Sequence, residues 1–181
     1  MSKRIIITGG LGYIGTELSK IYSGISWNNE ILVIDNRFVS ERVNQLRNWG
    51  IDFVHGDILD KELLNKHCKD ADVVHHLAGI TDVPRVKSES SENNDKKIKL
   101  TAEEGTQNLL DAISNKCKII FPSTHVVYEG IEKIQNNILE DEETKPILSY
   151  ASSKAFNEKQ LKNSGKNYII LRLGSVYGYS T

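Results

Sequence analysis

The sequence predicts an α/β protein in which a doubly wound parallel sheet carries helices on both faces. Apolar segments of strand length alternate with helix-like segments along the chain, which is typical of repeated strand–helix–strand units. Several apolar segments are nearly continuous in β-branched residues, so we expect these strands to be buried on both faces. Glycines are concentrated in the turn between the first strand and the first helix.

Six segments are predicted as strands, at residues 4–8, 31–35, 52–55, 72–77, 118–122 and 167–172. A doubly wound sheet of this kind has the strand order 3-2-1-4-5-6. The first helix is expected to end near Gly24, and its apolar face is predicted from helical spacing to be Ile14, Leu18, Ile21 and Tyr22.

Two further helices follow from local patterns. Asp60 can cap a helix that carries Leu63, Leu64, His67 and Cys68. Leu109, Leu110 and Ile113 mark the apolar face of another helix. Residues 87–97 and 129–145 are polar and charged, and we expect both to be solvated surface segments.

Length and composition exclude several classes of protein. The 181 residues fit one domain, and the formal net charge of -1, without a block of Lys and Arg, argues against nucleic acid or a membrane as partner. No apolar run suits a signal peptide or a membrane span, which predicts a cytoplasmic protein. Cys68 and Cys117 belong to no CxxC pair, so buried reduced thiols are favoured over a disulfide or a metal site.

The glycine-rich turn has the features of a phosphate-binding turn. Residues 10–15, GLGYIG, fit GxGxxG, and Gly9, Gly12 and Gly15 stand at three-residue intervals. The first glycines allow a tight turn, Gly12 leaves room for a pyrophosphate, and Gly15 lets the helix pack closely on the strand. The ligand's charge then lies at a helix N-terminus, whereas a Walker-type loop is excluded because its Gly-Lys-Ser/Thr ending is missing.

Asp35 indicates which dinucleotide the turn would bind. It ends the second predicted strand, about twenty residues after Gly15. Its carboxylate can accept hydrogen bonds from the ribose hydroxyls and would repel a 2′-phosphate, so NAD is favoured over NADP. Arg37, two residues later, keeps NADP open as an alternative.

A second motif suggests proton transfer. Tyr150 and Lys154 form YxxxK, which places both side chains on one helix face. A neighbouring ammonium favours the phenolate and lowers the pKa of a phenol from about 10 toward the range of a general base. Thr124, at the end of the fifth strand, can orient a substrate oxygen against Tyr150, or it can simply cap backbone groups.

Together these segments resemble the extended short-chain dehydrogenase/reductases, specifically the NAD-dependent sugar epimerase/dehydratase family. The matching segments stand in family order: TGGLGYIG (8–15), VIDN (33–36), GDILD (56–60), HHLAG (75–79), EGTQNLLDA (104–112), PSTHVVY (122–128), PILSYASSK (146–154) and LRLGSVYG (171–178). The resemblance implies a Rossmann-type NAD-binding domain over residues 1–181. It also implies that the family's C-terminal substrate domain is largely absent from this chain, through truncation or in a natural short relative.

The resemblance also implies roles for individual residues. Gly9, Gly12, Tyr13, Ile14 and Gly15 would line the pyrophosphate, Asp35 and Asn36 would hold the adenosine ribose, Asp57 and Ile58 would border the adenine, and Leu77, Ala78 and Gly79 would lie along the cofactor. Thr124, Tyr150 and Lys154 would form the catalytic set, with Tyr150 and Lys154 also contacting the cofactor.

The sequence departs from the family pattern in three places. Ala102 replaces an Asn of the active-site hydrogen-bonding and proton-relay scaffold. His125 and Val126 replace the Asp-Glu pair of the 4,6-dehydratase branch, which disfavours dehydration, and a structural role for His125 is favoured over acid/base catalysis. Ser175 and Tyr179 replace the Asn and Pro around VYG, which implies an atypical substrate.

The expected function is NAD-dependent epimerisation or reduction of a nucleotide-activated sugar. In such enzymes the tyrosine takes a proton from a sugar hydroxyl as hydride passes to the nicotinamide. Two alternatives stay open: a dinucleotide-binding module without catalysis, which Ala102 and the missing substrate domain favour, and a reductase of a non-sugar carbonyl. The resemblance further implies a homodimer that forms through the helices around residues 98–113 and 150–162.

Overall fold

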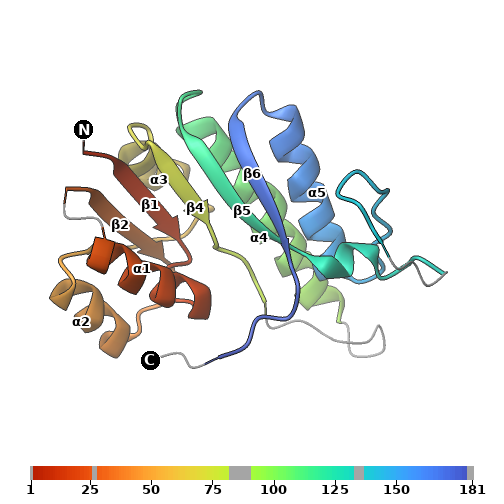
Figure 1. The fold of residues 1–181 in the computed structure, drawn as a ribbon, viewed down its shortest axis with the longest axis horizontal. Coiled ribbons are helices and arrows are strands. Elements are labelled where there is room, and N and C mark those ends of the chain that lie inside the picture. The colour runs from red at the N-terminus through yellow and green to blue at the C-terminus, as the bar shows by residue number, and fades with distance from the viewer. Residues whose placement is uncertain (1, 26–27, 82–90, 133–136, 179–181) are drawn as a thin grey trace.

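Six parallel strands form one sheet in the order β3-β2-β1-β4-β5-β6 (Figure 1). The computed structural model describes residues 2–25, 28–81, 91–132 and 137–178. The strands are β1 (Arg4–Thr8), β2 (Glu30–Asp35), β3 (Asp52–His55), β4 (Val73–His76), β5 (Lys118–Thr124) and β6 (Asn167–Leu173). The helices are α1 (Tyr13–Ile25), α2 (Ser40–Asn48), α3 (Lys61–Cys68), α4 (Glu92–Ala112), the 3-10 helix η2 (His125–Tyr128) and α5 (Ser149–Asn163). The predicted fold class and strand order are confirmed.

The strand bounds follow the predictions closely, with one difference that matters for the site. β1 and β3 have the predicted bounds, whereas β5 continues two residues beyond Pro122, to Thr124. The extension is stabilised because β6 pairs in register along its whole length, ending with Thr124 opposite Leu173. The hydroxyl of Thr124 therefore stands at the carboxyl end of the sheet.

Two apolar cores lie on opposite faces of the sheet. On one face, β1 and β2 pack through Ile5, Ile7 and Val33 against α2, with Leu18 and Tyr22 of α1 alongside. On the other face, strand residues such as Ile6 and Phe121 pack against α3, α4 and α5. Figure 1 shows the second layer, with α4 and α5 behind β4, β5 and β6.

β6 differs from the expected strand that is buried on both faces. Tyr168, Ile169 and Leu171 are all exposed by more than a third of their surface. β6 is an edge strand, and none of the described helices lies over the side of β5 and β6 that faces the viewer in Figure 1. The β-branched run identified a strand correctly, but burial depends on what covers it.

The buried face of α1 was predicted only in part: Leu18 and Tyr22 pack against the core, as expected. Ile14 and Ile21 are exposed, whereas Gly15, Thr16 and Ser19 are buried. Small residues face the protein because the helix starts directly on the glycine turn: a Cβ at Gly15 would stand only 2.5 Å from Gly10 Cα. The helix ends at Ile25, one residue after Gly24, as predicted.

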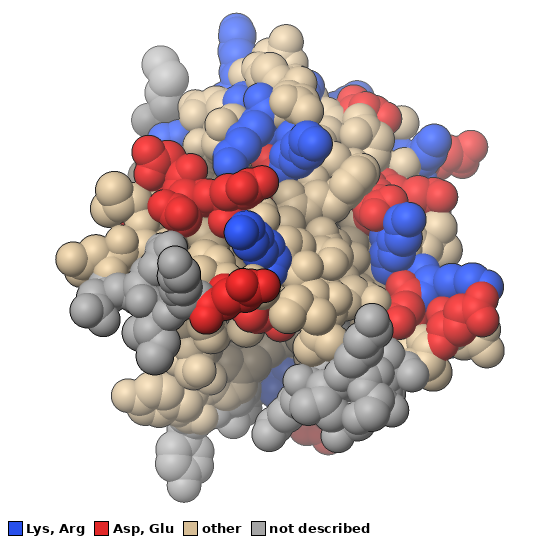
Figure 2. Space-filling view, turned by 90° about the vertical axis from the view of Figure 1, so that its right-hand side faces the viewer, with Lys and Arg blue, Asp and Glu red and all other residues tan. Residues whose placement is uncertain are grey.

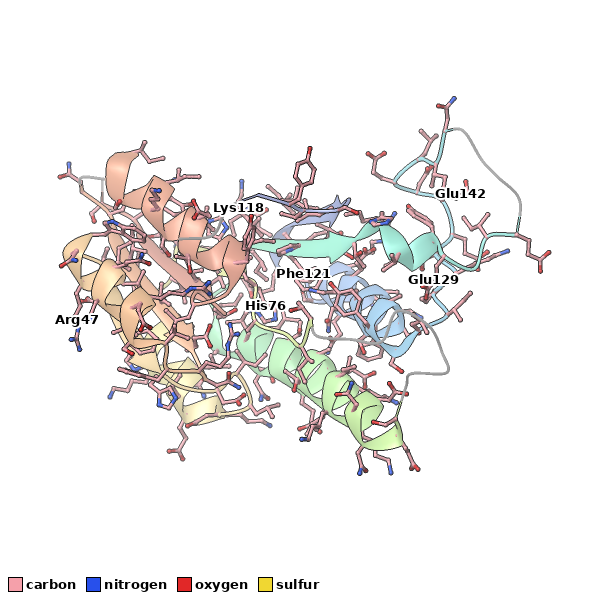
Figure 3. The ribbon with its side chains drawn as sticks, turned by 90° about the horizontal axis from the view of Figure 1, so that it is seen from below. Arg47, His76, Lys118, Phe121, Glu129 and Glu142 are labelled. Atoms are coloured by element: carbon pink, nitrogen blue, oxygen red, sulfur yellow. The ribbon has the colours of Figure 1, made fainter. Side chains whose placement is uncertain are left out.

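The two polar segments differ from each other. Residues 92–97 begin α4, where Ser91 caps the helix, while residues 87–90 lie outside the described residues. Residues 129–132 and 137–145 form no helix or strand and are mostly exposed, as expected. Their base is fixed by Glu129, whose carboxylate accepts hydrogen bonds of 2.6 Å from the amides of Ile147 and Leu148 (Figure 3).

Other expectations concern the core and the surface. Cys68 and Cys117 are fully buried free thiols, as predicted, and Asp60 caps α3 by accepting from the amide of Leu63 at 3.0 Å. On the face shown in Figure 2, acidic and basic side chains are interspersed. Within the described ranges, no helix is long and apolar enough to cross a membrane.

Candidate active site

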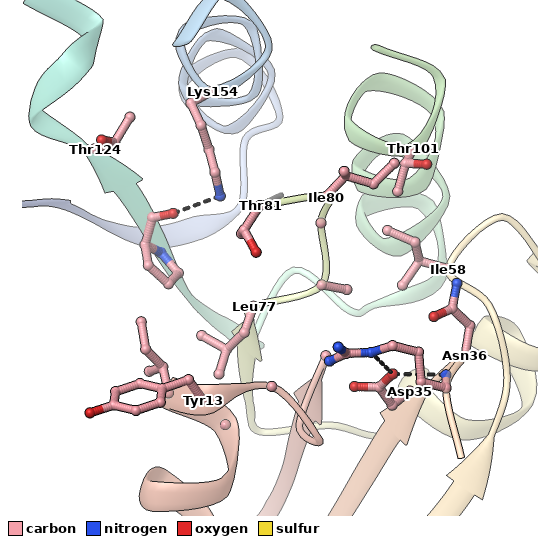
Figure 4. A pocket seen from close by; sticks show the side chains of 18 of the residues that line it. Tyr13, Asp35, Asn36, Ile58, Leu77, Ile80, Thr81, Thr101, Thr124 and Lys154 are labelled. Carbon is pink, nitrogen blue, oxygen red and sulfur yellow. Dashed lines mark hydrogen bonds and ion pairs between the residues drawn. The ribbon is translucent and has the colours of Figure 1, made fainter. Parts of the chain in front are cut away.

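A cavity of about 630 Å³ opens at the carboxyl ends of the strands. Its size falls in the usual range of small-molecule sites, and its position is the usual ligand site of a doubly wound sheet. Every residue that the sequence assigned to the cofactor or to catalysis lines it: Gly9, Gly12, Tyr13, Ile14, Gly15, Asp35, Asn36, Asp57, Ile58, Leu77, Ala78, Gly79, Thr124, Tyr150 and Lys154. In Figure 4, Thr124 and Lys154 lie at one end of the cavity and Asp35 and Asn36 at the other.

The glycine turn after β1 lies directly against the backbone that follows β4. Gly9 has a φ of +69°, and a Cβ there would stand 2.6 Å from the amide nitrogen of Ala78. The Gly9 amide donates to the carbonyl of Ile34 at 2.7 Å, which holds the turn against the end of β2. The tight path of the chain leaves Gly12 on the cavity wall, where a ligand can approach the main chain.

Asp35 is buried at the cavity wall and is already well bonded. Its carboxylate accepts from the amides of Leu11 at 3.0 Å and of Arg37 at 2.9 Å. The exposed Arg37 side chain forms an ion pair with the same carboxylate at 3.5 Å (Figure 4). Each carboxylate oxygen can accept more than one hydrogen bond, so capacity for ribose hydroxyls remains.

Asn36 and Asp57 form the neighbouring part of the wall. Asn36 Nδ2 donates to Asp57 at 2.9 Å, and Asp57 accepts from the amide of Leu59 at 2.9 Å. Ile58 packs on Gly105 of α4, where an added Cβ would stand 2.3 Å from Ile58 Cδ1. An apolar side chain beside two polar ones suits a purine base.

His76 holds the loop after β4 in place. Its Nδ1 lies 2.8 Å from Thr8 Oγ1 and its Nε2 lies 3.0 Å from Thr106 Oγ1, so the ring joins β1 to α4. Thr8 Oγ1 also accepts from the amide of Ala78 at 3.3 Å. Leu77, Ala78 and Gly79 thus follow a fixed path along the cavity.

The three residues predicted to be catalytic line the same cavity, but the hydrogen bonds of Lys154 and Thr124 are made to backbone groups of the protein. Lys154 Nζ donates to the carbonyl of Pro122 at 2.9 Å and lies 4.5 Å from the centroid of the Phe121 ring. Thr124 Oγ1 accepts from the amide of Val126 at 3.3 Å and so caps η2, which is the second of its two predicted uses. That contact leaves the hydroxyl proton free to donate toward the cavity.

The electrostatics differ from the simple expectation for YxxxK. Burial raises the pKa of Tyr150, whereas a neighbouring ammonium was expected to lower it. Lys154 Nζ lies 5.9 Å from the centroid of the Tyr150 ring and is directed to Pro122, so burial dominates. Burial also lowers the pKa of Lys154 to about 8, against the opposing effect of the Glu158 carboxylate.

The structure shows the environment of most of the residues that depart from the family pattern. Ala102 is on α4, and its carbonyl accepts from Asn157 Nδ2 of α5 at 2.9 Å. His125 is exposed, with Nδ1 3.2 Å from the carbonyl of Leu173, which supports the structural role. Ser175 is exposed, and Tyr179 lies outside the described residues.

Several lining residues were not predicted. They come from strand ends and from α4: Gly56, Ile80, Thr81, Thr101, Pro122, Leu173, Gly174 and Val176. The rule that parallel strands end at one edge could have suggested Gly56 and Leu173, which follow or end predicted strands. Thr101 is in the middle of a helix, and no local pattern marks it.

Comparison with known proteins gives a consistent result. A family model described as the NAD dependent epimerase/dehydratase family matches residues 5–181. A UDP-glucose 4-epimerase from Mycoplasma genitalium is 32% identical over 97% of this chain and 53% of its own length. A dTDP-D-glucose 4,6-dehydratase from Dictyostelium discoideum is 30% identical over 97% of this chain and 44% of its own length. The chain therefore spans about half the length of these curated relatives.

Solved structures give the same picture. A UDP-glucose 4-epimerase from Brucella ovis in complex with NAD is 30% identical, with a TM-score of 0.74 over 94% of this chain and 51% of that one. A UDP-N-acetylglucosamine 4-epimerase from Methanobrevibacter ruminantium in complex with UDP-N-acetylmuramic acid is 28% identical. Its TM-score is 0.78 over 94% of this chain and 54% of that one.

Proposed function

Because this chain belongs to the NAD dependent epimerase/dehydratase family, we propose that it forms the NAD-binding and catalytic part of an epimerase or reductase of nucleotide-activated sugars. NAD is the cofactor of the family, as the sequence predicted from Asp35. We further propose that residues 1–181 are one NAD-binding domain. Most of the residues that bind the sugar nucleotide would then lie outside residues 1–181.

One observation carries the proposal. Residues assigned from separate motifs, between Gly9 and Lys154, line a single cavity at the carboxyl edge of the sheet. A glycine turn alone occurs in many proteins, and YxxxK alone is common. Their convergence with Thr124 and Asp35 on one cavity is what a dinucleotide-dependent oxidoreductase site requires.

The wall of the cavity fits NAD in its chemistry. At the glycines of the turn no side chain separates a pyrophosphate from the main chain. The Asp35 carboxylate would accept hydrogen bonds from the hydroxyls of the adenosine ribose. NAD, when bound, supplies the hydride acceptor and donor. Tyr150 holds and moves a proton at its phenolic oxygen, Thr124 orients the substrate oxygen, and Lys154 donates to the nicotinamide ribose.

Epimerisation or reduction is favoured over elimination of water. Elimination in the dehydratase branch uses an acidic pair directly after the catalytic threonine, and here His125 and Val126 stand there. His125 is bonded to the Leu173 carbonyl at 3.2 Å, and its neighbour carries no titratable group. Val126 can supply neither an acid nor a base, and His125 alone does not replace the acidic pair that elimination uses.

A non-catalytic dinucleotide-binding module is the second candidate. Ala102 favours it, because a methyl group cannot form the hydrogen bonds of the family's asparagine. The Ala102 carbonyl is also bonded to Asn157, so the position serves the packing of α4 on α5.

Calorimetric titration with NAD tests the cofactor assignment. We expect Asp35→Ala to weaken NAD binding by about 10- to 100-fold, because one or two charge-assisted hydrogen bonds are lost. Asp52→Ala is the matched control, since Asp52 is an exposed aspartate at the start of β3, the end of that strand away from the cavity. Equal affinity of Asp35→Ala and the unsubstituted chain would refute the ribose assignment, provided that circular dichroism shows both folded.

Turnover separates the two candidates. With NAD bound, UDP-, GDP- and dTDP-sugars are added in turn, and epimeric products are separated by chromatography, because an epimerase returns the hydride to its substrate and accumulates no reduced nicotinamide. Reduction of small ketones and aldehydes is followed separately, starting from NADH, by the loss of NADH absorbance. Product formation that is lost in Tyr150→Phe supports the enzyme. Tight NAD binding with neither an epimeric product nor oxidation of NADH supports the binding module.

A further inference from the structure

Glu158 is a buried carboxylate directly behind the proposed catalytic residues. It is on α5, one helical turn after Lys154 and two turns after Tyr150. Only 2% of its surface is exposed. It accepts from Ser123 Oγ of β5 at 2.6 Å and, in a bidentate pair, from Arg172 Nε at 3.0 Å and Nη2 at 2.6 Å. The carboxylate thus connects α5 to both strands of the sheet edge.

Arg172 extends this connection to the other side of Thr124. Its Nη1 donates to the hydroxyl of Tyr128 and, at 2.9 Å, to the carbonyl of Glu140. The guanidinium carbon lies 5.0 Å from the centroid of the Tyr128 ring. Tyr128 ends η2, the helix that begins directly after Thr124. The residue before Thr124 and the helix after it are therefore both held by the Glu158–Arg172 pair.

The carboxylate also opposes the effect of burial on the pKa of Lys154, which lies one helical turn before it. Three titratable groups face Lys154: Tyr150 and Glu158 from α5, and His76 from β4. Burial lowers the pKa of His76 to about 3, so the imidazole is neutral. Burial raises the pKa of Tyr150, so the phenol is neutral as well. Of these three groups, only Glu158 carries a negative charge near the Lys154 ammonium.

We propose that Glu158 is a positioning residue: it fixes Tyr150 and Lys154 against Thr124 and supplies the negative charge that faces Lys154 from inside the protein. The inference rests on the proposed function of the cavity. It extends that function because it assigns the electrostatic setting of the site to a residue that contacts neither cofactor nor substrate. A merely structural ion pair would hold the same elements together and leave the titration of Lys154 unchanged.

The test uses Glu158→Gln, which keeps the shape and an accepting oxygen but removes the charge. Lysine side chains are labelled with 13C, the Lys154 signal is identified by its loss in Lys154→Arg, and its titration is followed by NMR. The pKa of Lys154 is about 8 in the unsubstituted chain, and we expect Glu158→Gln to lower it by about one unit. Glu104→Gln, an exposed glutamate on the adjoining helix α4, should leave it unchanged.

NAD affinity measured against pH is the second readout. Lys154 is charged below its pKa, so affinity that depends on the ammonium falls as pH rises through about 8. In Glu158→Gln this fall should occur at lower pH, whereas Glu158→Asp, which retains the charge, should restore the original profile. If Glu158→Gln does not fold, Glu158→Gln combined with Arg172→Gln removes the pair without leaving an unpaired guanidinium. The pKa of Lys154 should then fall by less than in Glu158→Gln, because loss of the more distant Arg172 charge acts in the opposite direction.

The outcomes separate this inference from the proposed function. An unchanged Lys154 titration in a folded Glu158→Gln or double variant overturns the inference, even if NAD binds normally. Failure of the unsubstituted chain to bind NAD overturns the proposed function, and the NMR titration still decides the role of Glu158. An unshifted NAD profile beside a shifted Lys154 titration shows that the charge on Lys154 does not support binding, which also overturns the positioning role.

Discussion

His76 shows how a single buried side chain can determine the behaviour of the site with pH. Both ring nitrogens are bonded to threonine hydroxyls on separate elements, and the ring lies beside Phe121, with centroids 5.8 Å apart (Figure 3). Burial lowers the pKa of His76 to about 3, with a smaller contribution from Lys154. Folding therefore requires the neutral imidazole.

Stability should consequently fall in acid. The pKa of His76 is about 3 in the folded chain and about 6.5 in the unfolded chain, so between these values the unfolded chain binds the extra proton. The free energy of unfolding then decreases by up to about 1.4 kcal/mol for each pH unit below 6.5. Urea unfolding between pH 7 and 5 measures this slope. His76→Gln should show a shallower slope, and an equal slope in both chains would contradict the assignment.

Sequence patterns identify individual residues of the cavity by their spacing, but they miss residues whose role depends on contacts between distant segments. Asp35, Tyr150 and Lys154 could be predicted because each stands at a fixed distance from another feature. Glu158 lies on the same helix face as Lys154, but its partners Ser123 and Arg172 become neighbours only when β5 pairs with β6. No local pattern carries that information.

Helix α1 illustrates what close packing demands of an element. Its buried positions are Gly15, Thr16 and Ser19, and the hydroxyls of Thr16 and Ser19 donate back to carbonyls one turn earlier, at 2.9 and 2.8 Å. Such self-satisfied small residues let the helix start on the turn that lines the cavity. The large apolar residues, Ile14 and Ile21, face outward instead.

Two glycines of this helix make a matched pair for mutation. Alanine at Gly15 would meet Gly10 Cα at 2.5 Å, so we expect a loss of about 1–3 kcal/mol of unfolding free energy and weaker NAD binding. Alanine at Gly24 meets nothing within 4 Å and should stabilise the chain by about 0.5–1 kcal/mol through helix propensity. Thermal unfolding of both variants measures the contrast. Equal effects would show that the contact with Gly10 does not constrain the turn.

At the scale of elements, strand positions could be predicted and strand environments could not. Continuous runs such as residues 4–8 mark a strand whatever covers it, because side-chain volume and β-branching act locally. The exposure of Ile169 and Leu171 depends on which element packs over β6, and that lies outside the strand's own sequence. The same reason explains why α1 was found but its inward face was predicted only in part.

The core under α3, α4 and α5 determines the chemistry of both thiols. Cys68 ends α3 and Cys117 precedes β5, and both belong to the core that packs under α3, α4 and α5. Burial is the main cause that raises the pKa of Cys68 to about 12 and of Cys117 to about 11. A thiol in this state is a poor nucleophile.

Thiol labelling should therefore report global unfolding. At mildly alkaline pH in the folded protein, we expect both cysteines to react with Ellman's reagent far more slowly than a free thiol. Both should react together across the urea transition that circular dichroism detects. Single Cys→Ser variants assign each reaction. Rapid labelling of either thiol in the folded chain would contradict the burial of this core.

The cavity draws its wall from nearly the whole length of the polypeptide. Gly9 and Val176 face the same space, and each of the six strands contributes a residue at or just beyond its carboxyl end. No fragment of the sheet can assemble this wall. A ligand that fills it binds the folded chain and not the unfolded one, so binding and folding are thermodynamically linked. Occupancy of the cavity would then stabilise the edge strand β6 as much as the turn that follows β1.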